Sequence, residues 1–169
     1  AAQLGAERPI VLGHSFGGAV GLAWALERPD NIAALVDVAG VAMPWPGKLD
    51  LYYRITGTAV GGAILPPILA AFVPQAHVDA TIAAIFAPAP EPDGYGDAVG
   101  APLTIRRESL RANTRQVNSL RPRIVAQSAR YATLDLPIEI VHGDEDTIVP
   151  LAVHSIPLSQ IAPDAVLTV

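Results

Sequence analysis

The sequence predicts an α/β fold with a partial doubly wound, mostly parallel sheet and an inserted all-helical segment. Short apolar runs and helical patterns follow one another as strand, helix, strand, long insertion, strand, helix, strand. The chain has 169 residues, enough for one domain with a core. Its 14 glycines and 16 prolines are too few for a low-complexity chain, so a folded domain with many loops is expected.

The expected core consists of residues 1–43 and 135–169. Residues 9–13, PIVLG, form a continuous apolar run that is typical of a parallel strand buried on both faces. A helix is expected over 15–28, where apolar residues recur at helical spacing until Pro29. Further buried strands are expected at 33–39, 137–142 and 165–169.

Residues 44–134 differ from the core in composition and are expected to form a helical cap over the carboxyl edge of the sheet. Proline-rich breaks divide this segment, at PWPG (44–47), at Pro66-Pro67 and in the loop 88–100. Helices are expected at about 48–60, 64–72, 76–86, 104–119 and 122–133.

Residues 55–78 carry no formal charge, so three interpretations stay open for them. They can form a hydrophobic lid over an apolar pocket, ordinary core helices, or a membrane span. The adjacent prolines and several glycines favour the lid.

The composition of the chain argues against several classes of binding partner and cofactor. A net charge of −5 and a pI near 5.2 argue against nucleic acid and against an anionic membrane surface. No cysteine is present, which excludes thiol catalysis and cysteine-based metal sites and fits a cytoplasmic protein. The first ten residues show no signal peptide. No metal or other cofactor is expected, because the histidines and carboxylates lack ligand spacing.

GHSFGG, residues 13–18, combines G-x-S-x-G with a buried strand before it and an apolar helix after it. Such a turn holds the hydroxyl of Ser15 clear of the backbone, and crowding at the turn is expected to require glycine at Gly13 and Gly17. The N–H of Phe16, at the start of the helix, can stabilise an oxyanion. The alternative is a tight strand-to-helix turn without catalytic role.

Together with HGDEDTIVP (142–150), this segment resembles the α/β-hydrolase superfamily, in its helical-cap serine hydrolase branch. The resemblance implies that Asp146 is the acid of a Ser-His-Asp triad and orients the catalytic histidine. Asp144 and Asp37 remain alternative acids, and the acidic cluster can also simply cap the following helix.

The resemblance implies a catalytic histidine after the last strand, about 15 to 25 residues beyond Val169, and a second oxyanion donor before Ala1. None of the four histidines, at positions 14, 77, 142 and 154, stands where the family places the base. The chain is therefore expected to be a fragment that is inactive alone. Its apolar strand edge at 9–13 is expected to favour self-association.

The predicted function of the full-length protein is hydrolysis of small apolar esters or related acyl substrates through an acyl-enzyme. A carbon–carbon bond hydrolase, a cofactor-free haloperoxidase and a non-catalytic ligand-binding protein remain alternatives. Seven of the ten arginines lie between positions 106 and 130. They are expected to form a solvated helix face or, alternatively, to supply one arginine that holds a substrate carboxylate.

Overall fold

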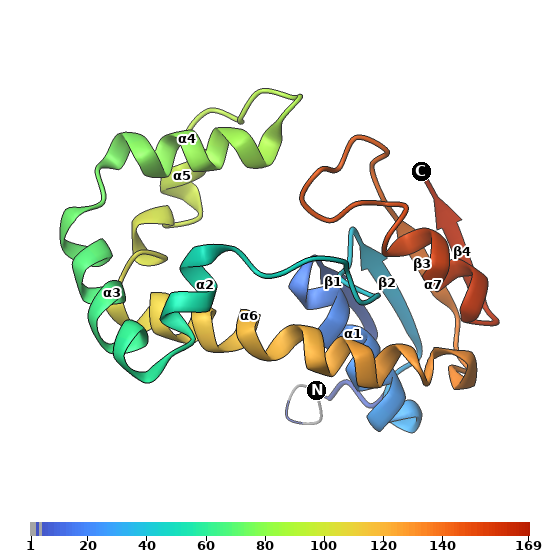
Figure 1. Ribbon diagram of the computed structural model, residues 1–169. Coiled ribbons are helices and arrows are strands. Elements are labelled where there is room, and N and C mark those ends of the chain that lie inside the picture. Colours follow the sequence, from blue (N-terminus) through green and yellow to red (C-terminus); the bar gives the residue numbers. More distant parts are fainter. Residues whose placement is uncertain (1–2, 4) are drawn as a thin grey trace. The chain divides into compact units, whose positions relative to one another are not determined.

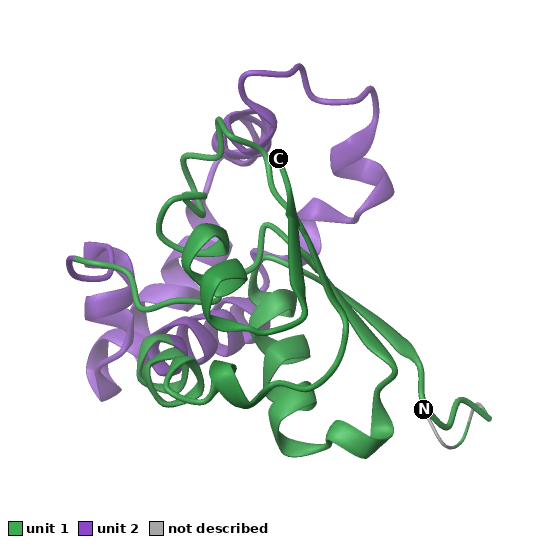
Figure 2. Cartoon of the chain, turned by 90° about the vertical axis from the view of Figure 1, so that its right-hand side faces the viewer, with its two compact units in different colours: residues 1–46, 121–169 green, residues 47–120 purple. Residues whose placement is uncertain are grey.

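The computed structural model describes residue 3 and residues 5–169. The chain divides into two compact units, one formed by residues 1–46 and 121–169 and the other by residues 47–120 (Figure 2). The sequence analysis placed the corresponding boundaries after residues 43 and 134.

The first unit contains a four-stranded sheet, in the order β1-β2-β3-β4 (Figure 1). Its strands are β1 (Ile10–His14), β2 (Ala34–Val38), β3 (Ile138–Val141) and β4 (Ala165–Thr168). All three strand pairs are parallel, with Gly13 opposite Asp37 and Val38 opposite Val141. The predicted parallel sheet is therefore confirmed.

The core of this unit lies on one face of the sheet. Helices α1 (Phe16–Glu27) and α7 (Ser155–Ile161) contribute Leu22 and Leu158, which pack with Leu35 of β2 and Ile140 of β3. All four side chains are completely buried. Short 3₁₀ turns, η2 (Pro29–Asn31) and η4 (Tyr131–Thr133), join these elements to the rest of the unit.

The opposite face of β1 is open. Ile10 and Leu12 are 68% and 67% exposed. The expectation that this strand is buried on both faces is thus wrong for the described part of the chain. The physical reason is that β1 is an edge strand, paired only with β2, while α1 and α7 both cover the face that carries Leu35.

The second unit is helical. It contains α2 (Leu51–Thr56), α3 (Ala59–Phe72), α4 (Gln75–Phe86), α5 (Tyr95–Ala98), the 3₁₀ turn η3 (Ala101–Leu103) and the first part of α6 (Arg107–Ser128). Val78, Ile82 and Ala101 form its small core.

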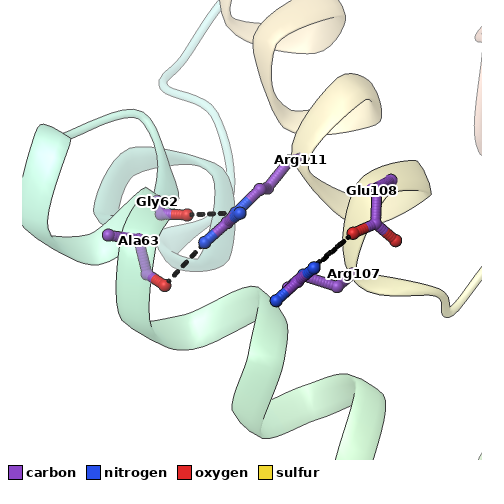
Figure 3. Close-up of polar contacts among 5 residues, drawn as sticks. All are labelled: Gly62, Ala63, Arg107, Glu108 and Arg111. Carbon is purple, nitrogen blue, oxygen red and sulfur yellow. Dashed lines mark hydrogen bonds and ion pairs between the residues drawn. The ribbon is translucent and has the colours of Figure 1, made fainter.

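The predicted helix break at Pro66-Pro67 is wrong, because α3 runs through both prolines. A proline at position i has no N–H for the carbonyl at i−4, so the carbonyls of Gly62 and Ala63 lose their helical partners. Arg111 replaces both: its Nε donates to Gly62 O at 3.2 Å and its Nη2 to Ala63 O at 3.0 Å (Figure 3). A side chain 48 and 49 positions away from these carbonyls in sequence therefore keeps this helix continuous.

Separate helices were expected at 104–119 and 122–133. In the structure one helix, α6, runs through Pro122 instead. The ring of Pro122 is exposed, and Leu120 and Ile124 beside it in sequence are 8% and 0% exposed. Burial of these two side chains offsets the cost of a proline inside the helix, which is about 3 kcal/mol.

Among the described residues, no helix has both the length and the hydropathy needed to cross a membrane alone. Helices α3 and α4 meet the criteria only as a pair, and the chain bends by 100° between them.

Candidate active site

Ser15 occupies the turn between β1 and α1, in a strained backbone conformation. Its φ is 53° and its ψ is −117°, a region that non-glycine residues rarely adopt. Strain of this kind costs about 1–3 kcal/mol and persists only where the surroundings impose it. Here the backbone of Ser15 is fixed on both sides, because its N–H donates to Val38 O at 3.0 Å and its carbonyl accepts from Val41 N at 3.1 Å.

The glycines around Ser15 have unequal roles. A Cβ on Gly13 would lie 2.3 Å from the carbonyl oxygen of Gly17, so the chain crosses itself closely at this position. The expectation that this crowding also requires glycine at position 17 is wrong, since a Cβ on Gly17 would meet nothing within 4 Å. The second crowded position is Gly18, where a Cβ would lie 2.1 Å from Oδ1 of Asp37 and 2.7 Å from Cα of Gly40.

Phe16 is the first residue of α1, directly after Ser15. The N–H groups of the first helical turn have no intrahelical carbonyl partner, and the helix dipole places a partial positive charge there. Ser15 is half-buried, and its hydroxyl has no hydrogen-bond partner among the described residues. This turn thus combines a free hydroxyl with the N-terminus of a 12-residue helix.

Asp146 lies in the loop after β3, and local amides hold its carboxylate. Oδ1 accepts from Ile148 N at 2.8 Å and from Val149 N at 2.9 Å. Oδ2 lies 3.5 Å from Nε2 of His142, and 23% of the side chain is exposed. The carboxylate is therefore oriented by its own loop and keeps one oxygen for a further partner. Asp144, in the same loop, is exposed.

Asp37, the third candidate acid, is sealed beneath the turn. It is 0% exposed, and neither carboxylate oxygen has a hydrogen-bond partner. Burial raises the pKa of Asp37 to about 6, and the backbone amide of Gly40, which completes no hydrogen bond of good geometry, opposes the shift only in part. A side chain covered in this way cannot contact an imidazole at the surface of the site.

Ser15 and Asp146 both follow carboxyl ends of parallel strands, β1 and β3, with β2 between them. Strands in a sheet are about 4.8 Å apart, so the two strand ends are separated by roughly 10 Å. No direct contact between the two side chains is present. A group of the size of an imidazole would be needed to form hydrogen bonds with both the Ser15 hydroxyl and the Asp146 carboxylate.

None of the histidines in the described residues forms a hydrogen bond with Ser15. His142 uses both ring nitrogens, on Ser155 Oγ at 2.6 Å and Val149 O at 2.7 Å. His154 is 3% exposed and its Nδ1 accepts from Met43 N. Burial, followed by the nearby His142, lowers the pKa of His154 to about 4. His77 belongs to the other unit, and His14 ends β1.

Two relationships in this region have no counterpart among the sequence-based predictions: the packing of Gly18 against Asp37 and the contact of His142 with Ser155. Both join residues from different elements. No local pattern in the sequence indicates either of them.

The arginine cluster is used in part for structure. Besides Arg111, Arg130 pairs with Glu27 and donates to Leu26 O, and Arg121 donates to Trp45 O. Arg111 and the exposed Arg115 also line a cavity of about 420 Å³ within the second unit. The guanidinium of Arg111 already donates to two backbone carbonyls, so these N–H groups are not available to bind a substrate carboxylate.

Comparison with known proteins identifies the fold. Residues 2–57 match a family model described as the alpha/beta hydrolase fold. Together with similar solved structures that cover nearly the whole chain, this match shows that the chain has the α/β-hydrolase fold, as its resemblance to that superfamily implies. No curated protein matches the chain.

Three solved structures illustrate the range of this fold. The 2-hydroxy-6-oxo-6-phenylhexa-2,4-dienoate hydrolase BphD of Rhodococcus sp. strain RHA1 is 19% identical, with a TM-score of 0.70, over 99% of this chain and 57% of that one. A monoacylglycerol lipase of Paleococcus ferrophilus is 19% identical, with a TM-score of 0.57, over 99% and 59%. The haloalkane dehalogenase variant DbeA-M1 of Bradyrhizobium elkanii is 15% identical, with a TM-score of 0.68, over 99% and 60%. The chain thus spans less than two thirds of the length of each.

Proposed function

We propose that the whole protein containing this chain is a serine hydrolase that acts on small apolar esters through an acyl-enzyme. The observation that carries the proposal is the conformation of Ser15, a serine at positive φ between β1 and α1. In this proposal the Ser15 oxygen attacks the acyl carbon, and the N–H of Phe16 stabilises the resulting oxyanion. One such donor contributes about 3–4 kcal/mol to transition-state stabilisation.

Asp146 serves in this proposal as the acid that orients the histidine base. Two amides hold one carboxylate oxygen, while the other keeps room for an imidazole N–H. The exposed Asp144 lacks this support, and Asp37 is fully covered. The base itself belongs, in this proposal, to a part of the whole protein outside residues 1–169, since no described histidine forms a hydrogen bond with Ser15, and His142 and His154 are buried with other partners.

Residues 47–120, which include the start of α6, act as the cap in this proposal. Exposed apolar side chains recur on α3 at four-residue spacing, at Val60, Ile64 and Ile68. Such a stripe suits contact with an apolar acyl chain. A carbon–carbon bond hydrolase would use the same visible residues, so the substrate class has to be tested separately from the nucleophile.

Fluorophosphonate labelling of the whole protein tests the nucleophile. We expect the parent to be labelled, Ser15→Ala to remain unlabelled, and Asp146→Asn to react at least 100-fold more slowly. Ser159→Ala is the matched control, because the Ser159 hydroxyl bonds only within its own helix, to Ile156 O. A parent that is not labelled would favour a non-catalytic binding protein. Turnover of p-nitrophenyl esters compared with a vinylogous diketone then separates ester from carbon–carbon cleavage.

A further inference from the structure

A continuous set of hydrogen bonds joins the loop of Asp146 to the start of α7 through His142. The hydroxyl of Ser155 lies 2.6 Å from Nδ1 of His142, and Nε2 of His142 lies 2.7 Å from the carbonyl oxygen of Val149. The N–H of Val149 in turn donates to Oδ1 of Asp146 at 2.9 Å. His142, Ser155 and Val149 are 2%, 0% and 6% exposed, so water does not compete for these bonds.

The partners determine which ring nitrogen of His142 carries hydrogen. A carbonyl oxygen only accepts, so Nε2 must donate to Val149 O, and Nε2 also lies 3.5 Å from Oδ2 of Asp146. With this hydrogen on Nε2, Nδ1 is left to accept from the Ser155 hydroxyl. The carbonyl of Val149 thus selects the tautomer, and the Ser155 hydroxyl, which can donate or accept, holds the ring in the orientation that the carboxylate loop requires.

We propose that His142, held by Ser155, is a positioning residue for the carboxylate of Asp146. It fixes the carbonyl of Val149, whose amide fixes Oδ1, and so leaves Oδ2 oriented for the catalytic imidazole. The inference rests on the proposed role of Asp146 as the acid. His142 does not contact substrate in this scheme and is not itself the base.

The kinetic test uses His142→Leu and Ser155→Ala in the whole protein, with an ester substrate. A displaced carboxylate no longer orients or stabilises the imidazolium, so we expect kcat to fall about 10- to 100-fold while KM stays within about twofold. The acid limb of the pH profile of kcat/KM should move to lower pH, because the base loses part of the interaction that favours its protonated form. A simple loss of stability would lower the amount of active enzyme without moving that limb.

His154→Gln, measured at pH 8, is the matched control. His154 is as buried as His142 and also bonds a backbone group, Met43 N, but it forms no hydrogen bond to the loop of Asp146. We expect this variant to keep the parental kcat and KM at that pH. Parental kcat and parental pH profile in both His142→Leu and Ser155→Ala, with Asp146→Asn inactive, would overturn the positioning role while leaving the proposed function intact.

A second readout does not depend on activity, so it separates failure of this inference from failure of the proposed function. The amide protons of Ile148 and Val149 donate to Asp146 Oδ1, and their NMR shifts as a function of pH report the protonation of that carboxylate. We expect both pH-dependent shifts to shrink to less than half in His142→Leu and to persist in His154→Gln. If they persist in His142→Leu, the inference is wrong, even for a protein that cleaves no ester.

Discussion

Gly18 of α1 lies directly against the carboxylate of Asp37, because a Cβ at position 18 would lie only 2.1 Å from Oδ1. Gly40 lies against the same oxygen, at 1.9 Å by the same measure. The serine turn is therefore built on a fully buried acid packed against two glycines. Packing against Asp37 therefore requires glycine at positions 18 and 40, whereas Gly17 matches the G-x-S-x-G motif without such a steric requirement.

Alanine at position 18 should destabilise the protein, while alanine at position 17 should not. We expect Gly18→Ala to cost about 1–3 kcal/mol, because the added methyl group must displace Asp37 or Gly40. Gly17→Ala meets nothing within 4 Å and gains helix propensity, so it should be neutral or stabilising by up to about 1 kcal/mol. Urea unfolding of the two variants measures the difference, and equal midpoints would contradict this packing.

Asp37 should make the protein less stable as pH rises. Burial raises its folded-state pKa from an ordinary 3.8 to about 6, so between these values the folded state binds more protons than the unfolded state. Stability should therefore fall between pH 4 and pH 6, by about 3 kcal/mol from this group, and then level off.

Asp37→Asn removes this ionisation. Its stability relative to the parent should rise by up to about 3 kcal/mol from pH 4 to pH 7. Thermal unfolding at the two pH values measures the change. A difference that does not vary with pH would show that Asp37 has a pKa near 3.8 in the folded protein.

His154 should make the protein more stable as pH rises, the opposite of the effect of Asp37. Its folded-state pKa is lowered from an ordinary 6.5 to about 4, so the unfolded state binds more protons between these values. Stability from this group should rise with pH from 4 to 6.5, by about 3 kcal/mol, and remain constant above. His154→Gln should flatten this part of the unfolding profile, and an unchanged slope would exclude a buried neutral imidazole.

Arg111 should be coupled energetically to the two prolines of α3. Arg111→Ala leaves the carbonyls of Gly62 and Ala63 without partners, at an expected cost of about 1.5–3 kcal/mol. In a background where Pro66 and Pro67 are alanine, helical N–H groups replace the guanidinium, so the cost should fall by at least half.

Amide hydrogen exchange in α3 measures this double-mutant cycle. Arg115→Ala is the control, since Arg115 lines the same cavity but forms no hydrogen bond within the described residues. Additive effects of the arginine and proline substitutions would contradict the coupling.

The sequence by itself determined the order of strands and helices, the parallel sheet and the position of Ser15 at a strand-to-helix turn. These features depend on hydrophobic periodicity and on glycine placement over a few residues, which act before distant parts of the chain meet. The loop of Asp146 is also local, because its carboxylate is held by amides two and three positions further along.

Only the tertiary structure decided the features that depend on distant residues. Helix α3 continues through Pro66 because Arg111 supplies what the backbone lacks, and Asp37 is sealed because Gly18 and Gly40 close over it. In each case the free energy comes from desolvation and from partners far away in sequence, which no local pattern encodes. For the same reason, the contact of His142 with Ser155 depends on the tertiary fold, which brings the residue after β3 to the first residue of α7.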